Sequence, residues 1–134
     1  MKTFEEIIIG DEVALQRTIS PEDVDAFVQL TGDDNPLHVD ADFAATTSLR
    51  KPVVHGMLGA SFISTLIGQE LPGPGALWYE LNIRFISPVR VGETITVTAK
   101  VRHKTESMRL LALDISIAAN NGTKVIEGEA KVQS

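Results

Sequence analysis

The segment V-V-H-G-M-L-G-A-S-F-I-S-T-L-I-G-Q, residues 53–69, is the most apolar stretch of the sequence and predicts its central element. Its apolar residues recur at helical spacing and leave little polar face: Val53, Val54, Met57, Leu58, Phe62, Ile63, Leu66 and Ile67. A helix that is apolar nearly all round has to be buried. We therefore predict one buried helix over residues 53–69, which is too short and too polar in places to span a bilayer.

The sequence after this helix has the pattern of β-strands. In residues 93–102, polar side chains alternate strictly with Ile95, Val97, Ala99 and Val101. The same reasoning predicts strands over residues 76–87, 111–117 and 124–133, a hairpin turn at Asn121-Gly122, and a shorter strand near residues 13–19. We expect a single α+β domain over residues 1–134, in which an antiparallel sheet wraps around one long apolar helix. The uncovered face or an edge of that sheet then meets water or a second subunit.

The sequence before residue 53 predicts helices separated by a loop. Ser20-Pro21 is a strong helix start and Gly32 fits a helix end, so a helix is expected over residues 21–31. Pro36 keeps the preceding residue out of the α region, which predicts an extended, stiff loop from Asp33 to His38. A short helix is expected over residues 42–46.

Composition excludes several classes of function. The net charge is −6 and the sequence has no run of Lys and Arg, which argues against broad nucleic-acid binding. Cysteine is absent, so disulfides, thiolate nucleophiles and zinc–thiolate sites are excluded. No signal peptide is visible at the N-terminus, and we expect a cytoplasmic protein with no membrane association.

The residues that suggest chemistry gather in T-G-D-D-N-P-L-H, residues 31–38, and at the start of the apolar helix. Asp33 and Asp34 are acids, and His38 can gain or lose a proton near neutral pH. His55-Gly56 lies where the apolar helix begins, so free amides and the helix dipole favour negative charge there. The lack of a side chain at Gly56 lets a carbonyl oxygen approach the backbone.

Each of these features also has a structural interpretation. Asp-Asn-Pro is common in turns that have no function, and a His before a helix is often a satisfied core residue. A metal site formed by His38, His55 and the aspartates is a further alternative, although no recognised ligand spacing supports it. The residues alone leave these alternatives open.

Two blocks of the sequence resemble the MaoC-like (R)-specific enoyl-CoA hydratases, also called hydratase 2. The first is F-V-Q-L-T-G-D-D-N-P-L-H, residues 27–38, followed by Val39-Asp40 and Ala44; the second is R-K-P-V-V-H-G-M-L, residues 50–58. The spacing of the blocks and the chain length also match short bacterial members. Ala41 departs from the pattern, because many members have proline there.

The resemblance implies a hot-dog fold, which is a sheet wrapped around one apolar helix and usually dimerised through the sheets. It implies that Asp33 and His38 form the catalytic pair and that Asp34 is a bystander. It further implies that the Gly56 amide stabilises the thioester oxyanion and that Ser61 lines the site near the pair. The implied reaction is reversible hydration of trans-2-enoyl-CoA to (R)-3-hydroxyacyl-CoA by a homodimer that needs no cofactor and no metal.

Four basic residues are candidates for binding the phosphates of an acyl-CoA substrate: Arg50, Lys51, Arg84 and Arg90. Three other functions remain alternatives to the hydratase. A 3-hydroxyacyl-[acyl-carrier-protein] dehydratase uses the same chemistry, but the net charge of −6 does not favour an acidic carrier protein. A hot-dog thioesterase fits the D-x-N-P-L-H block poorly, and the intact acid–histidine pair argues against a non-catalytic acyl-thioester binding module.

Overall fold

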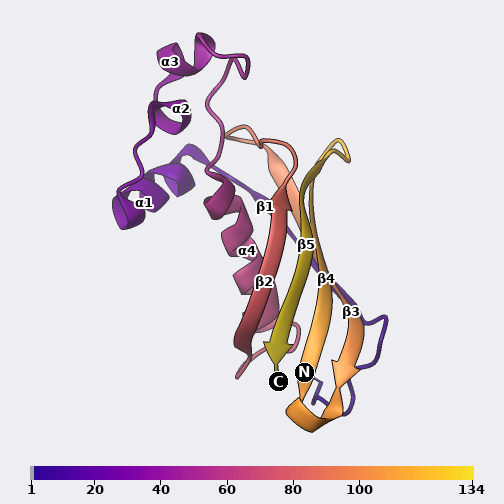
Figure 1. Ribbon diagram of the computed structural model, residues 1–134. Helices are drawn as coiled ribbons and strands as arrows, with labels where there is room; N and C mark the ends of the chain where they lie inside the picture. The colour runs from indigo at the N-terminus through magenta and orange to yellow at the C-terminus, as the bar shows by residue number, and fades with distance from the viewer. Residues whose placement is uncertain (1) are drawn as a thin grey trace.

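A five-stranded antiparallel sheet forms one layer of the protein in a computed structural model, which describes residues 2–134 (Figure 1). The strand order is β1-β3-β4-β5-β2. A short 3-10 turn at Glu106–Met108 joins β3 to β4. The strands are β1 (Glu12–Thr18), β2 (Leu77–Phe85), β3 (Thr94–Thr105), β4 (Leu110–Ala119) and β5 (Lys124–Gln133). All five predicted strands are confirmed, although β3 continues three residues beyond the prediction through an irregularity between Val101 and His103.

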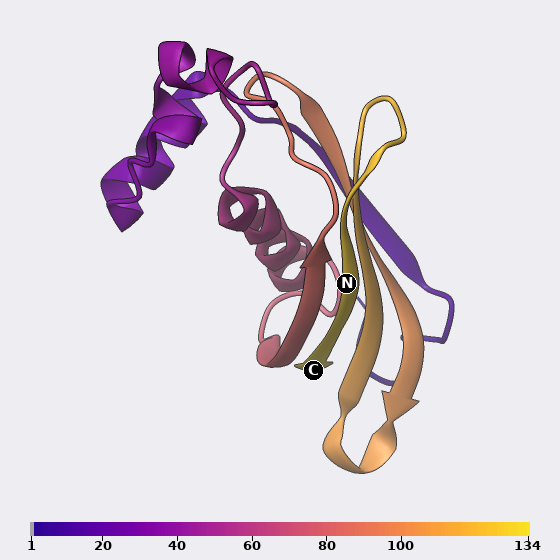
Figure 2. The same ribbon diagram turned by 45° about the horizontal axis from the view of Figure 1, so that its top comes forward.

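Helix α4 (Gly56–Gln69) lies along one face of this sheet, which curves around it (Figures 1 and 2). Ile63, Leu66 and Ile67 have no exposed surface and pack with the inward side chains of β3, β4 and β5. The predicted α+β arrangement of a sheet wrapped around one apolar helix is therefore confirmed. Burying this apolar surface is the main source of stability for such a fold.

The prediction for α4 was wrong in two details. The helix begins at Gly56 instead of residue 53, because Val53 is held extended by a bridge to Arg90. The helix is also not buried all round, since Met57 is 61% exposed and Ser61 is exposed as well. The exposed side of α4 faces the edge of the sheet at β2.

Three helices project beyond one end of the sheet: α1 (Pro21–Thr31), α2 (Pro36–Val39) and α3 (Ala41–Ala45) (Figure 2). Helix α1 begins as predicted, with a reciprocal capping box between Ser20 and Asp23, and ends at Gly32 with φ +79°. The prediction of an extended loop up to residue 38 was wrong. Only residues 32–35 lie between helices, because Pro36 suits the first position of a helix and starts α2.

Strand β2 is one of the two edges of the sheet, opposite β1, since β5 is its single partner among residues 2–134. Eight of its nine residues are exposed, among them the large apolar side chains of Leu77, Trp78, Tyr79, Leu81 and Phe85. Within the same described residues, every helix falls short of the length and apolar character that a membrane span requires.

Candidate active site

Asp33 is presented by the turn that follows α1. Gly32 adopts a left-handed conformation and redirects the chain, and the Asp33 N–H donates to Thr31 Oγ1 at 3.2 Å. The carboxylate accepts a hydrogen bond from the Asn35 N–H at 3.3 Å, and the side chain is 53% exposed. One carboxylate oxygen is therefore free to meet a substrate or a water molecule.

His38 is positioned by α2 and by the segment that precedes α4. Asn35 caps α2 by accepting the Leu37 N–H at 3.0 Å. The Nδ1 atom of His38 lies 2.7 Å from the Val53 carbonyl oxygen. Because a carbonyl only accepts, Nδ1 carries the hydrogen of this bond and Nε2 is the nitrogen left for chemistry.

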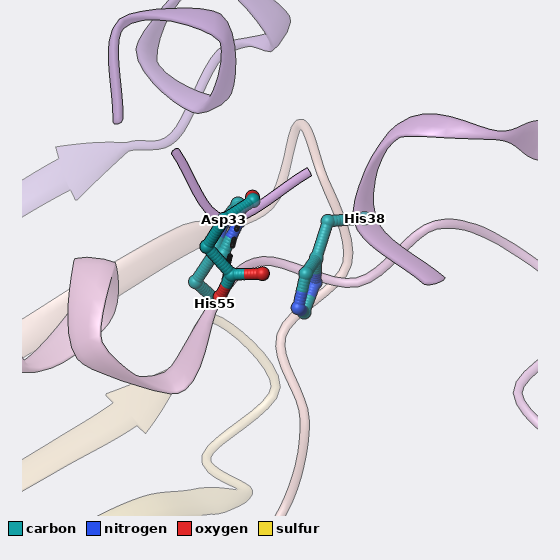
Figure 3. Close-up of side chains that lie close together, drawn as sticks. All are labelled: Asp33, His38 and His55. Carbon is teal, nitrogen blue, oxygen red and sulfur yellow. Dashed lines mark hydrogen bonds and ion pairs between the residues drawn. The ribbon is translucent and has the colours of Figure 1, made fainter. Parts of the chain in front are cut away.

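His55 lies beside both residues (Figure 3). Its Nε2 donates to the backbone carbonyl of Asp33 at 2.9 Å and lies 3.9 Å from Asp33 Oδ2. Its ring stacks on His38 with centroids 3.8 Å apart and an angle of 27° between the planes. The ring of Phe27 also contacts the His55 ring, with centroids 4.8 Å apart. Donor atoms of the two histidines and Asp33 thus lie within 4.8 Å of one another.

This cluster fits a metal ion poorly in the observed geometry. Zn²⁺ needs nitrogen lone pairs that converge on one point at about 2.0–2.1 Å. The His38 and His55 rings are stacked nearly parallel, so their in-plane lone pairs do not converge. The Nε2 atom of His55 is also occupied by the Asp33 carbonyl. The arrangement is better suited to proton transfer than to metal binding.

The start of α4 adjoins this cluster. His55 is the N-cap residue, but its side chain makes no capping hydrogen bond, so the first amides of the helix are not consumed by it. Gly56 is the first helical residue, and a Cβ atom there would lie 2.9 Å from the ring of Phe85. A side chain at position 56 would therefore displace that ring, whereas glycine leaves the amide accessible.

A cavity of about 320 Å³ extends from these groups. Its polar side is formed by His38, His55 and the Gly56 backbone. The rest of its wall is mostly apolar and includes Leu37, Leu49, Val53, Phe85, Pro88 and Ile126. An apolar cavity with a few convergent polar groups is typical of a binding site for a small, partly apolar substrate.

A family model described as "MaoC like domain" matches residues 6–120. The chain belongs to the MaoC-like domain family. The matched region contains α1 to α4 and most of the sheet, including Asp33, His38 and the start of α4. The resemblance noted from the two sequence blocks is thereby confirmed.

Named relatives of this MaoC-like chain agree in reaction type. An (R)-specific enoyl-CoA hydratase of Rhodospirillum rubrum is 40% identical over 129 residues, which is 96% of this chain and 89% of the relative. The solved structure of the (R)-hydratase of Aeromonas caviae has a TM-score of 0.94 at 37% identity and covers 96% of this chain and 98% of its own. A mitochondrial 3-hydroxyacyl-[acyl-carrier-protein] dehydratase of Arabidopsis thaliana is 32% identical and covers 91% of this chain and 74% of the relative. The chain thus has the hot-dog fold of the (R)-hydratases and is a hydro-lyase.

The structure of this MaoC-like domain brings together Asp33, His38 and the Gly56 amide, but it places Ser61 elsewhere. The Ser61 hydroxyl donates to the Met57 carbonyl at 2.7 Å, on the exposed side of α4. Ser61 lines a separate hollow of about 400 Å³ between α4 and β2, so within one chain it does not border the pair.

The structure also distinguishes the four basic candidates. Arg84 pairs with Glu127 at 3.1 Å on the sheet, and Arg90 donates to the Leu49 carbonyl at 3.1 Å. Arg50 and Lys51 are exposed and directly follow Leu49, which lines the 320 Å³ cavity. These two remain available to a ligand at that cavity.

Sequence reasoning underestimated His55 and missed Phe85. His55 is buried, as the core interpretation expects, and it also bonds the Asp33 carbonyl and stacks on His38. Its position directly before a glycine at a helix start was the available signal. Phe85 lies 29 residues after Gly56 in the sequence and ends a strand, so no local pattern connects it to Gly56.

Proposed function

We propose that this protein is an (R)-specific enoyl-CoA hydratase, which reversibly adds water to trans-2-enoyl-CoA to give (R)-3-hydroxyacyl-CoA. The observation that carries the proposal is the placement of a free Asp33 carboxylate and the Nε2 side of His38 beside the start of α4, in a chain 40% identical to an (R)-specific enoyl-CoA hydratase. His38 borders an apolar cavity suited to an acyl chain, and ligand atoms of Asp33 and His38 lie within 4.8 Å of each other. We place the reaction in the cytoplasm, which agrees with the lack of cysteine.

In the hydration direction, Asp33 and His38 hold one water molecule between them. Asp33 accepts a proton from this water as its oxygen attacks C3, and a proton on His38 Nε2 passes to C2. The proton taken up by Asp33 then returns to His38, which restores the pair, so one water is consumed and no other group changes. Positioned proton transfer of this kind contributes typically ~10²–10⁴-fold to the rate.

The thioester oxygen gains negative charge as water attacks C3. We assign its stabilisation to the Gly56 N–H at the start of α4, with the helix dipole adding to the effect. A donor of this type contributes about 3–4 kcal/mol in measured cases. Hydration changes no oxidation state overall and needs only these proton transfers, so the proposal includes no cofactor; the coenzyme A portion belongs to the substrate.

Arg50 and Lys51 are the residues that we assign to the phosphates of coenzyme A. Both are exposed beside the cavity, and neither has an ion-pair partner among residues 2–134. Replacing both by glutamine should raise KM for the CoA ester while leaving kcat nearly unchanged, because phosphate binding is equally strong before and during the reaction. The paired Arg84 provides the control, and its replacement by glutamine should leave KM unaltered.

We further propose that the protein is a homodimer formed along β2 and the exposed side of α4. Leu77, Tyr79 and Leu81 expose 59%, 51% and 42% of their surface on a free sheet edge, next to Met57 at 61%. An exposed apolar strand edge favours pairing with another strand. A second copy would also cover the hollow that contains Ser61, so contact between Ser61 and substrate depends on that copy.

The dimer has a direct test. Leu81→Glu places a charge on the edge and should shift sedimentation from dimer to monomer, whereas Glu129→Gln, on the inner strand β5, should not. A monomeric wild-type protein would contradict the proposed dimer.

The second candidate is a 3-hydroxyacyl-[acyl-carrier-protein] dehydratase, which the 32% identical plant relative favours. The chemistry would be the same and the carrier would differ. Acidic carrier proteins associate best with a basic surface, and the net charge of −6 does not supply one. Comparing kcat/KM for crotonyl esters of CoA and of a carrier protein would separate the two candidates.

The reaction itself is tested by following the loss of enoyl absorbance of crotonyl-CoA. The product is then oxidised by a 3-hydroxyacyl-CoA dehydrogenase specific for the (R) form. Fast loss with an (R) product is expected. Release of free thiol without hydration would indicate a thioesterase, and no change with either carrier would indicate a binding module.

A further inference from the structure

His55 has an unusual environment for a histidine at the start of a helix. It is the only polar or charged residue buried in the described part of the chain, with 3% of its surface exposed. Burying a polar side chain is unfavourable unless its hydrogen bonds are satisfied, and here Nδ1 has no partner among residues 2–134. A role in packing would be met better by an apolar ring, so the hydrogen bond of Nε2 is the feature that needs an explanation.

The Nε2 bond holds the backbone of the residue that carries the catalytic carboxylate. Nε2 lies 2.9 Å from the Asp33 carbonyl and 3.9 Å from Asp33 Oδ2. The carbonyl only accepts, so Nε2 carries the hydrogen, and in the neutral ring Nδ1 then has a lone pair and no hydrogen. This hydrogen bond, called the tether below, therefore fixes the main chain at Asp33 and leaves its carboxylate free.

The second contact of His55 is the stacking of its ring on the imidazole ring of His38. The His38 ring lies on the His55 ring at 3.8 Å, with 27° between the planes, while His38 Nδ1 is held by the Val53 carbonyl. These two contacts restrict the rotation of His38. One side chain thus touches both members of the pair, and it comes from a position 17 residues after His38 in the sequence.

We propose that His55 is a positioning residue, which fixes the distance between the Asp33 carboxylate and His38 Nε2 through its bond to the Asp33 carbonyl and its stack on His38. Asp33 lies in an exposed turn between two helices, and its other hydrogen bonds, with Thr31 and Asn35, are local. A displacement of about 1 Å at a reacting group costs on the order of 10²-fold in rate. The catalytic part of this inference rests on the hydratase reaction proposed above.

Two substitutions separate the tether from the ring. His55→Gln keeps an N–H donor near the position of Nε2 and removes the ring, whereas His55→Phe keeps the ring and the stack and removes the donor. For His55→Phe we expect kcat to fall about 10–100-fold with KM changed less than about 3-fold. Hydrogen exchange of the backbone amides over residues 33–35 should accelerate in the same variant. His55→Gln should retain exchange close to that of wild type and at least about a tenth of its kcat.

Melting temperature serves as the control for folding in both variants. Wild-type kcat and wild-type exchange in His55→Phe would overturn the proposal. Equal acceleration of amide exchange over residues 33–35 in the two variants would also overturn it, since one keeps the donor and the other lacks it. Should the wild-type protein fail to hydrate enoyl thioesters, the proposed function fails; the exchange comparison still decides whether His55 holds the Asp33 turn.

Discussion

Replacing the Asp33 carboxylate by an amide is the most direct perturbation of the proposed pair, and the structure predicts that Asp33→Asn folds normally. The Asn35 N–H donates to Asp33 Oδ1 at 3.3 Å, and the oxygen of an amide can accept this hydrogen bond equally well. The Asp33 carbonyl that accepts from His55 belongs to the backbone and is unchanged. With a side chain 53% exposed, the free energy of unfolding should change by less than about 0.5 kcal/mol.

The loss of activity should be far larger than this change in stability. An amide of the same shape cannot accept the proton from water, so the whole contribution of the base is removed. That contribution is ~10²–10⁴-fold in kcat, or about 3–5 kcal/mol of activation free energy. The assay is the loss of enoyl absorbance with crotonyl-CoA at saturating concentration, with thermal melting measured on the same preparation.

Asp34→Asn is the matched control, because it makes the same chemical change one residue away. The Asp34 N–H donates to the Gly32 carbonyl at 3.1 Å, and its exposed carboxylate lies outside the cluster of Asp33, His38 and His55. We expect wild-type kcat for this variant. An inactive Asp34→Asn together with a normal Asp33→Asn would refute the assignment of roles.

Three other substitutions probe the site, the sheet and the first helix. His38→Ala should lower kcat by orders of magnitude and also cost about 1 kcal/mol of unfolding free energy, from the lost bond to the Val53 carbonyl, as measured by urea denaturation. Gly128→Ala would bring Cβ to 2.7 Å from the Ile83 Cα atom, so overpacking against β2 should destabilise the protein by about 1–3 kcal/mol; an unchanged melting temperature would contradict this contact. Hydrogen bonding by the Ser20 backbone N–H, with further help from Arg17, holds the pKa of Asp23 below its ordinary value of 3.8. Because the folded-state pKa is lowered, this stabilisation is present above pH 3.8 and disappears as the pH falls through the lower folded value. Near neutral pH, Asp23→Ala should therefore lower the free energy of unfolding by about 1 kcal/mol. This loss of stability should become smaller in melting curves recorded below pH 3.8.

The elements of this fold were predictable where their signals are local. Alternation of side chains in residues 93–102 follows directly from a strand with one buried face, and β3 has that burial pattern. The helix over residues 21–31 was bounded correctly because Ser20 and Gly32 carry the capping chemistry of its two ends. The start of α4 was placed three residues too early, since a distant partner, Arg90, holds Val53 extended.

The candidate site was predictable only in part, for the same reason. Asp33 and His38 lie close in sequence, and the family resemblance named their roles. The contacts of His55 with both of them depend on the path of the chain through α3, which no periodicity encodes. The position of Ser61 depends on how α4 is rotated relative to the sheet, and its relation to a second copy cannot be derived from one chain's sequence.

The contacts between the two sequence blocks explain why they belong together. The Val53 N–H donates to the Leu37 carbonyl at 3.2 Å, and the Val53 carbonyl accepts from His38 at 2.7 Å. With the bond from His55 to the Asp33 carbonyl, three hydrogen bonds join residues 33–38 to residues 53–55. Because α4 is anchored in the core by Ile63, Leu66 and Ile67, these bonds transfer the rigidity of the core to an exposed turn. In the proposed reaction, the first block supplies the reacting groups, and the second block holds them in register with the amide assigned to the thioester oxygen.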